Sequence, residues 1–305
     1  METKLFSESE INKAANFLIE DKLVAFPTET VYGLGANALS ENAIKKIFLA
    51  KGRPSDNPLI IHIAKKEQLN NLVYKIPKIA EKLMQEFWPG PLTLVFEKSN
   101  KVPKLITAGL NTVAIRMPAH KIALKLIKKA NIPIAAPSAN SSTKPSPTLA
   151  EHVIEDLDGK IEGIIDGGKV EVGIESTVLD LTDSIPTILR PGKVTKEDLE
   201  KVIGKVRTKT GSGKETKSPG MKYKHYSPNA KVLLAPIKEF EKLKQKYKNK
   251  KIGEIKLSSN LEDYAKNIFS SFRKMDKENV EIILVESVDE KGLGVGIMNR
   301  LKKAA

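Results

Sequence analysis

A short segment, KGRPSDNP (residues 51–58), gathers two cations, a hydroxyl and an amide on a turn that two prolines stiffen. Arg53 could donate two parallel hydrogen bonds to a phosphate, and Lys51 could add a point charge beside it. Asn57 adds an amide donor. These residue types suit a polyphosphate ligand, although a solvated lysine-rich turn is the simpler interpretation of this segment alone.

Two apolar runs carry polar side chains on one face. In TVAIR (residues 112–116), the two-residue period of a strand puts Thr112 and Arg116 on the face opposite Val113 and Ile115. In LIIHI (residues 59–63), the same period separates His62 from most of the apolar side chains. A face covered by a ligand explains both patterns, and a hydrogen-bonded core histidine explains His62 equally well.

A further polar group follows the apolar run IPIAA (residues 132–136). Ser138 and Asn140 come directly after it in APSAN, and Ser146 follows on a loop with several prolines. An irregular loop that leaves a core strand is a typical place for a binding site, although an Asx or Ser turn is the commoner explanation. Because open α/β sheets bind ligands at such strand ends, we expect these segments to face one site.

The elements that must position these side chains alternate before Lys205 between strand-like and helical patterns, which is typical of an α/β domain. The predicted strands are 23–27, 59–63, 92–96, 112–116, 132–136 and 176–181, and the predicted helices are 8–20, 42–50, 78–87 and 121–130. Prolines at several strand ends argue against a wholly regular doubly wound sheet.

The composition changes after Thr208, where about twenty residues are rich in Gly, Ser, Thr, Lys and Pro and read as a linker. Three apolar runs then alternate with three helical patterns, which predicts a small Rossmann-like βαβαβα unit with parallel strands. We therefore predict one domain at 1–207, a linker at 208–229 and a second domain at 230–305.

The bulk composition excludes several kinds of chemistry. The chain has no cysteine, so disulfides, thiolate nucleophiles and cysteine metal sites are excluded. No apolar stretch approaches the ~20 residues of a membrane span, and the N-terminus does not resemble a signal peptide, so we expect a soluble cytoplasmic protein with no membrane partner. The net charge of +14 falls mostly after Thr208; it could attract RNA, but a solvated lysine-rich helix face is the simpler interpretation.

Known nucleotide and metal motifs are incomplete. GIIDGGK (163–169) and TKTGSGK (208–214) lack the features of a P-loop and are interpreted as turns. VYGLGAN (31–37) approaches a dinucleotide fingerprint, but no acidic residue clearly ends a second strand ~20 residues later. The four histidines lack the spacing of a metal site.

Taken in order, the segments FPTETVYGLG, KxRP..NPL, WPGPLTL, RMP, PSAN, STV and RPG resemble the YrdC-like domain of threonylcarbamoyl-AMP synthases over residues 5–200. SPGMKYKHYSP and the short α/β tail are similar to the two-domain form of that family. The resemblance implies a curved mixed α/β sheet with flanking helices, whose concave side holds ATP and threonine.

The resemblance also implies a set of site residues. The signature residues, expected to be catalytic, are Lys51, Arg53, Ser138 and Asn140. Threonine would be held by Thr30, His62, Arg116 and Ser176, and the nucleotide by Lys51, Arg53, Asn57, Thr112, Ser138, Asn140, Ser146 and Arg190. Tyr223, His225 or Tyr226 of the linker would fold over the occupied cavity.

The implied reaction joins L-threonine, bicarbonate and ATP into threonylcarbamoyl-AMP and pyrophosphate, for threonylcarbamoyladenosine formation in tRNA. Mg²⁺ would accompany the phosphates without a site made of protein side chains alone, and a tRNA threonylcarbamoyl transferase complex would receive the product. One alternative is a module that binds double-stranded RNA or tRNA without catalysis. Another is a carbamoyltransferase domain of the hydrogenase maturation type, against which the missing acylphosphatase-like and zinc-finger segments count.

Overall fold

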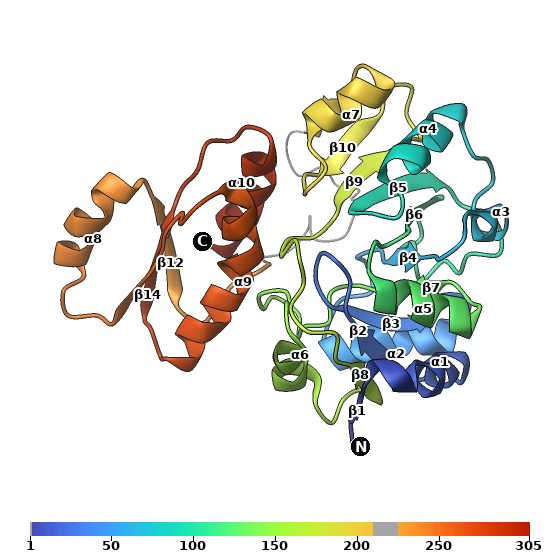
Figure 1. Ribbon diagram of the computed structural model, residues 1–305, viewed down its shortest axis with the longest axis horizontal. Helices are drawn as coiled ribbons and strands as arrows, with labels where there is room; N and C mark the ends of the chain where they lie inside the picture. The colour runs from blue at the N-terminus through green and yellow to red at the C-terminus, as the bar shows by residue number, and fades with distance from the viewer. Residues whose placement is uncertain (1, 210–224) are drawn as a thin grey trace.

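A large mixed sheet forms the centre of the N-terminal part of the molecule, which we call the large unit (Figure 1). The computed structural model describes residues 2–209 and 225–305. The eleven strands are ordered β1-β8-β2-β3-β7-β4-β6-β5-β9-β10-β11. Their bounds are β1 Lys4–Phe6, β2 Val24–Phe26, β3 Gly33–Asn37, β4 Ile60–His62, β5 Leu92–Glu97, β6 Thr112–Arg116, β7 Ile134–Ala135, β8 Gly163–Ile165, β9 Thr177–Asp180, β10 Thr187–Arg190 and β11 Arg207–Thr208.

Helices flank this sheet and bury its apolar faces, as the mixed α/β fold class predicts. They are η1 Glu8–Glu10, α1 Ile11–Ile19, α2 Glu41–Lys51, η2 Lys66–Gln68, α3 Leu69–Leu72, α4 Lys78–Phe87, α5 Lys121–Ala130, α6 Ala150–Leu157 and α7 Lys196–Ile203. The predicted elements 78–87, 112–116 and 121–130 are confirmed to the residue. The strand predicted at 132–136 is shorter, and the first predicted helix begins with the 3₁₀ turn η1.

Five strands were not predicted, namely β1, β3, β8, β10 and β11. Two of them, β3 and β8, contain glycine at points where a neighbouring strand packs closely against the backbone. In β3, a Cβ on Gly35 would lie 2.8 Å from the Phe26 ring and 3.0 Å from the Val24 carbonyl oxygen. The interpretation of GIIDGGK as a turn was wrong for its first three residues, which form β8. There a Cβ on Gly163 would lie 2.5 Å from the Phe6 ring, so the packing requires glycine.

The small unit, residues 231–305, is the predicted βαβαβα arrangement with parallel strands. It contains β12 Lys231–Ala235, η3 Ile237–Glu239, α8 Phe240–Lys246, β13 Ile252–Ile255, α9 Leu261–Lys277, β14 Ile282–Glu286 and α10 Leu293–Ala304. β14 lies between β12 and β13 and pairs in parallel with both. Figure 1 shows α9 and α10 on the side of this sheet that faces the large unit, with α8 on the opposite side.

An apolar cluster joins the two units. Val31 and Ile174 of the large unit pack with Tyr226, Phe269 and Ile297. Burial of such a cluster stabilises the docked arrangement by roughly 25 cal/mol per Å² of apolar surface removed from water. Across residues 2–209 and 225–305, no helix has the length and hydropathy needed to cross a membrane.

Candidate active site

A cavity of about 60 Å³ lies between the sheet, the loops that leave it and residues His225 and Tyr226, which precede the small unit. Its lining includes nine of the residues predicted from sequence, namely Thr30, Arg53, His62, Arg116, Ser138, Ser176, Arg190, His225 and Tyr226. The fold therefore brings together side chains that lie up to 196 residues apart in the chain, from Thr30 to Tyr226.

Arg116 ends β6 and is paired in register with His62 at the end of β4. Its Nε donates to the Gly90 carbonyl at 3.2 Å and its Nη1 to the Thr30 hydroxyl at 2.9 Å. Its Nη2 lies 2.7 Å from the Glu29 carboxylate as an ion pair, but Nη2 donates no hydrogen bond of standard geometry within the described residues. Because a guanidinium has five N–H donors, Nη1 and Nη2 can still bind a carboxylate ligand side by side.

His62 is buried and neutral. Burial and the neighbouring Arg116 charge lower the pKa of His62 to about 3. Its Nδ1 is buried and makes no hydrogen bond of standard geometry within the described part of the chain, but backbone groups of Ile60 and Ile134 lie close enough to raise the pKa slightly. Because the ring also lines the cavity, its position is compatible with a ligand contact.

Ser176 precedes β9 and connects two elements of the wall. Its hydroxyl lies 2.7 Å from the Thr93 hydroxyl on β5 and accepts a hydrogen bond from Arg190 Nη2 at 3.1 Å. Arg190 also donates from Nε to the Ser176 carbonyl at 3.1 Å. Burial lowers the pKa of Arg190 to about 10, so Arg190 remains a cation at neutral pH.

Glu175 is a wall residue that the sequence analysis missed. It accepts hydrogen bonds from the Ser146 hydroxyl at 2.5 Å and from Nε of Arg300, on α10, at 2.9 Å. Burial alone would raise the pKa of Glu175, but the Arg300 and Arg190 charges and these hydrogen bonds lower it to about 2. Its position directly before Ser176 is the one sequence signal that could have identified it.

The two cations of KGRPSDNP take different places. Arg53 lines the cavity and donates from Nη2 to the carbonyls of Asn57 and Pro58 at 3.3 and 3.2 Å. Lys51 does not line the cavity; its ammonium donates to the carbonyls of Ser138 and Asn140 at 2.6 and 2.5 Å. Burial, and then the Arg53 charge, hold the pKa of Lys51 well below its usual value.

The remaining predicted residues lie outside the lining. Asn57 and Asn140 each have a buried Oδ1 without a partner in the described residues, and Ser146 bonds to Glu175. Thr112 stands at the opposite end of β6 from Arg116, about 13 Å away at the rise of a strand. Tyr223 falls outside the described residues. Contacts of these side chains with a nucleotide stay predictions.

The chain is similar to known proteins over nearly its whole length. A family model described as "Telomere recombination" matches residues 16–192, and one described as "Threonylcarbamoyl-AMP synthase, C-terminal domain" matches residues 194–305. A threonylcarbamoyl-AMP synthase of Pyrococcus abyssi is 55% identical over 98% of this chain and 94% of its own length. The chain belongs to the threonylcarbamoyl-AMP synthase family. A member of the family from Bacillus subtilis is 47% identical over 98% of this chain and 94% of its own length.

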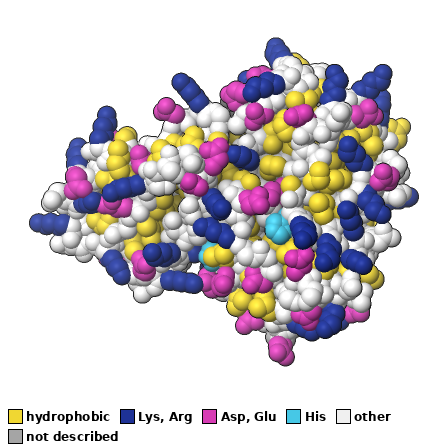
Figure 2. Space-filling view, in the orientation of Figure 1, with side chains coloured by type: hydrophobic (Ala, Val, Ile, Leu, Met, Phe, Trp, Pro, Cys, Tyr) yellow, Lys and Arg dark blue, Asp and Glu magenta, His cyan; other side chains and the backbone are white. Residues whose placement is uncertain are grey.

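The same fold occurs in a solved structure of a family member. The crystal structure described as P. abyssi Sua5 complexed with L-threonine superimposes with a TM-score of 0.94 at 53% identity, and covers 100% of this chain and 97% of that one. The predicted family and fold are therefore confirmed. The alternative of an RNA-binding module without catalysis is not supported by these similarities. Figure 2 shows Lys and Arg interspersed with Asp and Glu over the visible face.

Proposed function

We propose that this chain makes threonylcarbamoyl-AMP and pyrophosphate from L-threonine, bicarbonate and ATP. One observation carries the proposal: Arg116, which could bind a carboxylate, and Arg53, which could bind a phosphate, line one cavity. A site for threonine alone would need only the first group, and a site for ATP alone would need only the second.

In the proposed reaction, the threonine amine first condenses with bicarbonate and releases water, giving a carbamate. A carbamate oxygen then attacks the α-phosphorus of ATP, forming the O–P bond while the bond to the bridging oxygen breaks and pyrophosphate leaves. No covalent enzyme intermediate is required. Catalysis then depends on positioning and on neutralising charge, which fixed cations in a buried cavity supply.

The side chains would divide this work. Arg116 would bind the threonine carboxylate with Nη1 and Nη2, and Thr30 fixes the direction of Nη1. The open Nδ1 of His62 would bond the threonine amine or hydroxyl. Arg53 and Arg190 would neutralise the phosphates, with Lys51, Ser138, Asn140, Asn57, Thr112 and Ser146 completing the nucleotide side.

Magnesium would arrive with the ATP phosphates. In residues 2–209 and 225–305, no group of three or more His, Asp or Glu side chains could hold a metal ion. Glu175, the acidic residue among the described residues that line the cavity, already accepts from Ser146 and Arg300. No step above depends on a metal site made of protein side chains alone.

The proposal extends to the cover of the cavity and to the fate of the product. His225 and Tyr226 line the cavity, and the Tyr226 ring stacks on Phe269 of α9 with centroids 5.2 Å apart. We assign them to a lid at the end of a 208–229 linker between domains 1–207 and 230–305. A tRNA threonylcarbamoyl transferase complex would consume the adenylate in the cytoplasm, and a direct contact with tRNA is part of this hypothesis.

The test combines ATP, labelled bicarbonate and each amino acid in turn. A labelled acyl adenylate and pyrophosphate should form with threonine and not with serine or valine. Arg53→Ala should lower threonine-dependent pyrophosphate release at least about thirtyfold, because a lost charged partner in such a site costs roughly 2–5 kcal/mol. Arg207→Ala removes an exposed arginine of β11 and is the matched control. Wild-type activity in Arg53→Ala would refute the phosphate assignment.

A further inference from the structure

The nucleotide side of the cavity depends on an irregular loop. Residues 138–146, which we call the nucleotide loop, contain neither helix nor strand. Thr143 has φ +75°, a left-handed conformation that is rare outside glycine and costs of order 1–3 kcal/mol. A loop in such a conformation keeps its shape only if surrounding contacts impose it.

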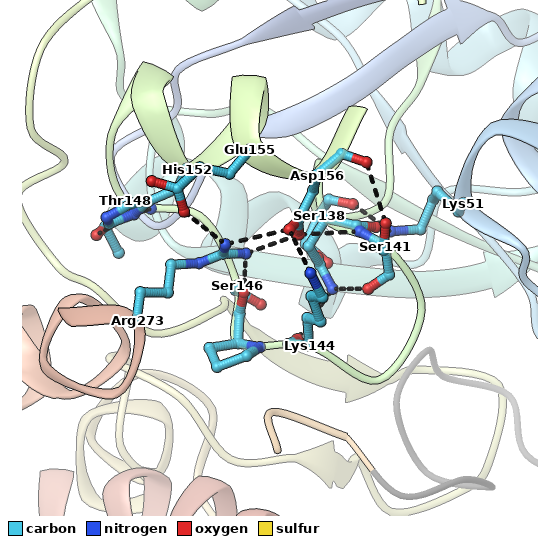
Figure 3. A network of polar contacts seen from close by, with 12 residues as sticks. Lys51, Ser138, Ser141, Lys144, Ser146, Thr148, His152, Glu155, Asp156 and Arg273 are labelled. Carbon is cyan, nitrogen blue, oxygen red and sulfur yellow. Dashed lines mark hydrogen bonds and ion pairs between the residues drawn. The ribbon is translucent and has the colours of Figure 1, made fainter. Parts of the chain in front are cut away.

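The first of these contacts come from the large unit (Figure 3). Lys51 bonds the carbonyls of Ser138 and Asn140. The Asn140 amide in turn donates to the carbonyls of Ser141 and Lys144 at 2.8 and 3.0 Å. These bonds fix the first half of the loop against α2, but they leave its second half to other partners.

Asp156, on α6, holds that second half. Its carboxylate accepts from the Ser141 backbone N–H at 3.1 Å and from the Lys144 ammonium at 3.2 Å. The Asp156 side chain is fully buried. A buried carboxylate needs close cations to stay ionised, and Lys144 is itself half-exposed, so its charge is screened by solvent.

The strongest partner of Asp156 comes from the small unit. Arg273, on α9, forms a two-pronged pair with Asp156, with Nη2 at 2.8 Å and Nη1 at 3.3 Å. Nη2 also donates to the Pro145 carbonyl at 2.6 Å, directly before Ser146. Arg273 is 5% exposed, so this pair is desolvated on both sides. Figure 3 shows the Arg273 side chain reaching from its helix to Asp156 and the loop.

The pKa of Asp156 agrees with this arrangement. Burial alone would raise the pKa of Asp156, but the hydrogen bond and charge of Arg273, followed by those of Lys144, lower it below the usual value. Asp156 is therefore an anion at neutral pH, and its attraction for Arg273 operates under the conditions in which the loop must be formed.

We propose that Arg273 is a positioning residue for the nucleotide: through Asp156 and Pro145 it holds the nucleotide loop in the shape that directs Ser138, Asn140 and Ser146 at ATP. The inference rests on the proposed function, since the nucleotide assignment of the loop belongs to it. In this proposal the small unit contributes to the reaction by positioning the nucleotide loop, and Arg273 itself does not touch the substrate.

The threonine side provides the internal reference. Arg116 and His62 stand on β6 and β4, where ladder hydrogen bonds fix the backbone independently of the loop. Loss of Arg273 should therefore weaken nucleotide binding and leave threonine binding unchanged. A general loosening of the two units would change both.

The experiment uses full-length protein and calorimetric titration with a non-hydrolysable ATP analogue and, separately, with L-threonine. Arg273→Ala should raise the Kd of the analogue at least tenfold and change that of threonine less than threefold. In steady-state assays the KM for ATP should rise with the KM for threonine unchanged. Arg273→Lys, which restores the charge without the fork, should recover part of the loss.

Asn267→Ala is the matched control. Asn267 is on the same helix and accepts a hydrogen bond from Lys169 of the large unit at 2.7 Å, away from the loop. It should leave both constants unchanged. If Arg273→Ala does not fold, Asp156→Asn and Arg273→Lys carry the test on protein shown to be folded by circular dichroism.

Equal changes in both constants, or no change in either, would overturn the role of Arg273. Wild-type protein that neither binds the analogue nor forms the adenylate would instead overturn the proposed function, and the inference with it. The two failures are thus distinguished by the wild-type titration.

Discussion

The pair between Arg116 and Glu29 permits a test that separates folding from binding at one residue. Both side chains are 4% exposed and their charged atoms lie 2.7 Å apart. In Arg116→Gln, Glu29 stays buried without its cation, which costs about 3–5 kcal/mol of unfolding free energy. The same change removes the group that would bind the threonine carboxylate, at about 2–5 kcal/mol, or roughly 30-fold to several thousandfold in Kd.

A second substitution separates the two losses. In the double variant Arg116→Gln/Glu29→Gln, no charge is left buried, and two amides of similar shape replace the pair. We expect it to recover most of the lost stability in urea unfolding but none of the lost threonine affinity in calorimetry. Glu29→Gln alone should keep threonine affinity within a few fold, because Arg116 is still present and Thr30 still orients Nη1.

The double variant tests whether Arg116 binds the threonine carboxylate. If it binds threonine like the wild type, Arg116 does not bind the carboxylate and its role is structural. If it remains as unstable as Arg116→Gln, the burial of an uncompensated Glu29 charge is not the cause of the instability. Arg207→Gln, at an exposed position, should leave both measurements unchanged.

Two further predictions concern docking and pH. Gly173 and Gly168 both have positive φ, +81° and +72°, but only at Gly173 would a Cβ come within 2.4 Å of the Lys266 backbone on α9. In urea unfolding, Gly173→Ala should therefore cost about 2 kcal/mol more than Gly168→Ala, and equal costs would contradict the close contact. The pKa of His62 is about 3 in the folded state against an ordinary value of 6.5 for histidine, so its contribution to stability is complete above pH 6.5 and is lost as pH falls toward 3. Between pH 7 and pH 5 the unfolding free energy should fall by about 2 kcal/mol on its account, and His62→Gln should show a smaller fall.

Regular elements with a clear apolar period could be predicted from sequence. Residues 78–87 and 121–130 have their apolar side chains at helical spacing, and 112–116 alternate as a strand, so local pattern and burial agree. Strand β3 could not be predicted this way. Its glycines carry no side chain to alternate, and the reason for them, the nearby Phe26 ring, lies in another strand.

The site was predictable as a set of residue types rather than as a set of contacts. Strand ends, one turn and the linker supplied the predicted polar side chains, and nine of the predicted residues line one cavity. Sequence could not show that Lys51 faces the carbonyls of a loop 87 residues away. It could not pair Glu175 with Arg300 either, because the two are 125 residues apart and belong to different units of the molecule. Such long-range pairs depend on how distant parts of the chain pack together, and local sequence patterns carry no information about that packing.

The cavity lining contains several arginines, and the ligands proposed for the cavity give a reason for their presence. Of the lining residues in the described part of the chain, three are arginines and one, Glu175, is acidic. Each buried ion carries a desolvation cost of several kcal/mol that protein partners offset only in part. Arg116 has Glu29 as a partner, and Arg190 lies near Glu175. Threonine brings a carboxylate and ATP brings phosphates, and both are opposite in charge to the arginines of the lining. The folded protein thus holds cations in place at the point where negative charge accumulates during the reaction, and these cations stabilise the transition state.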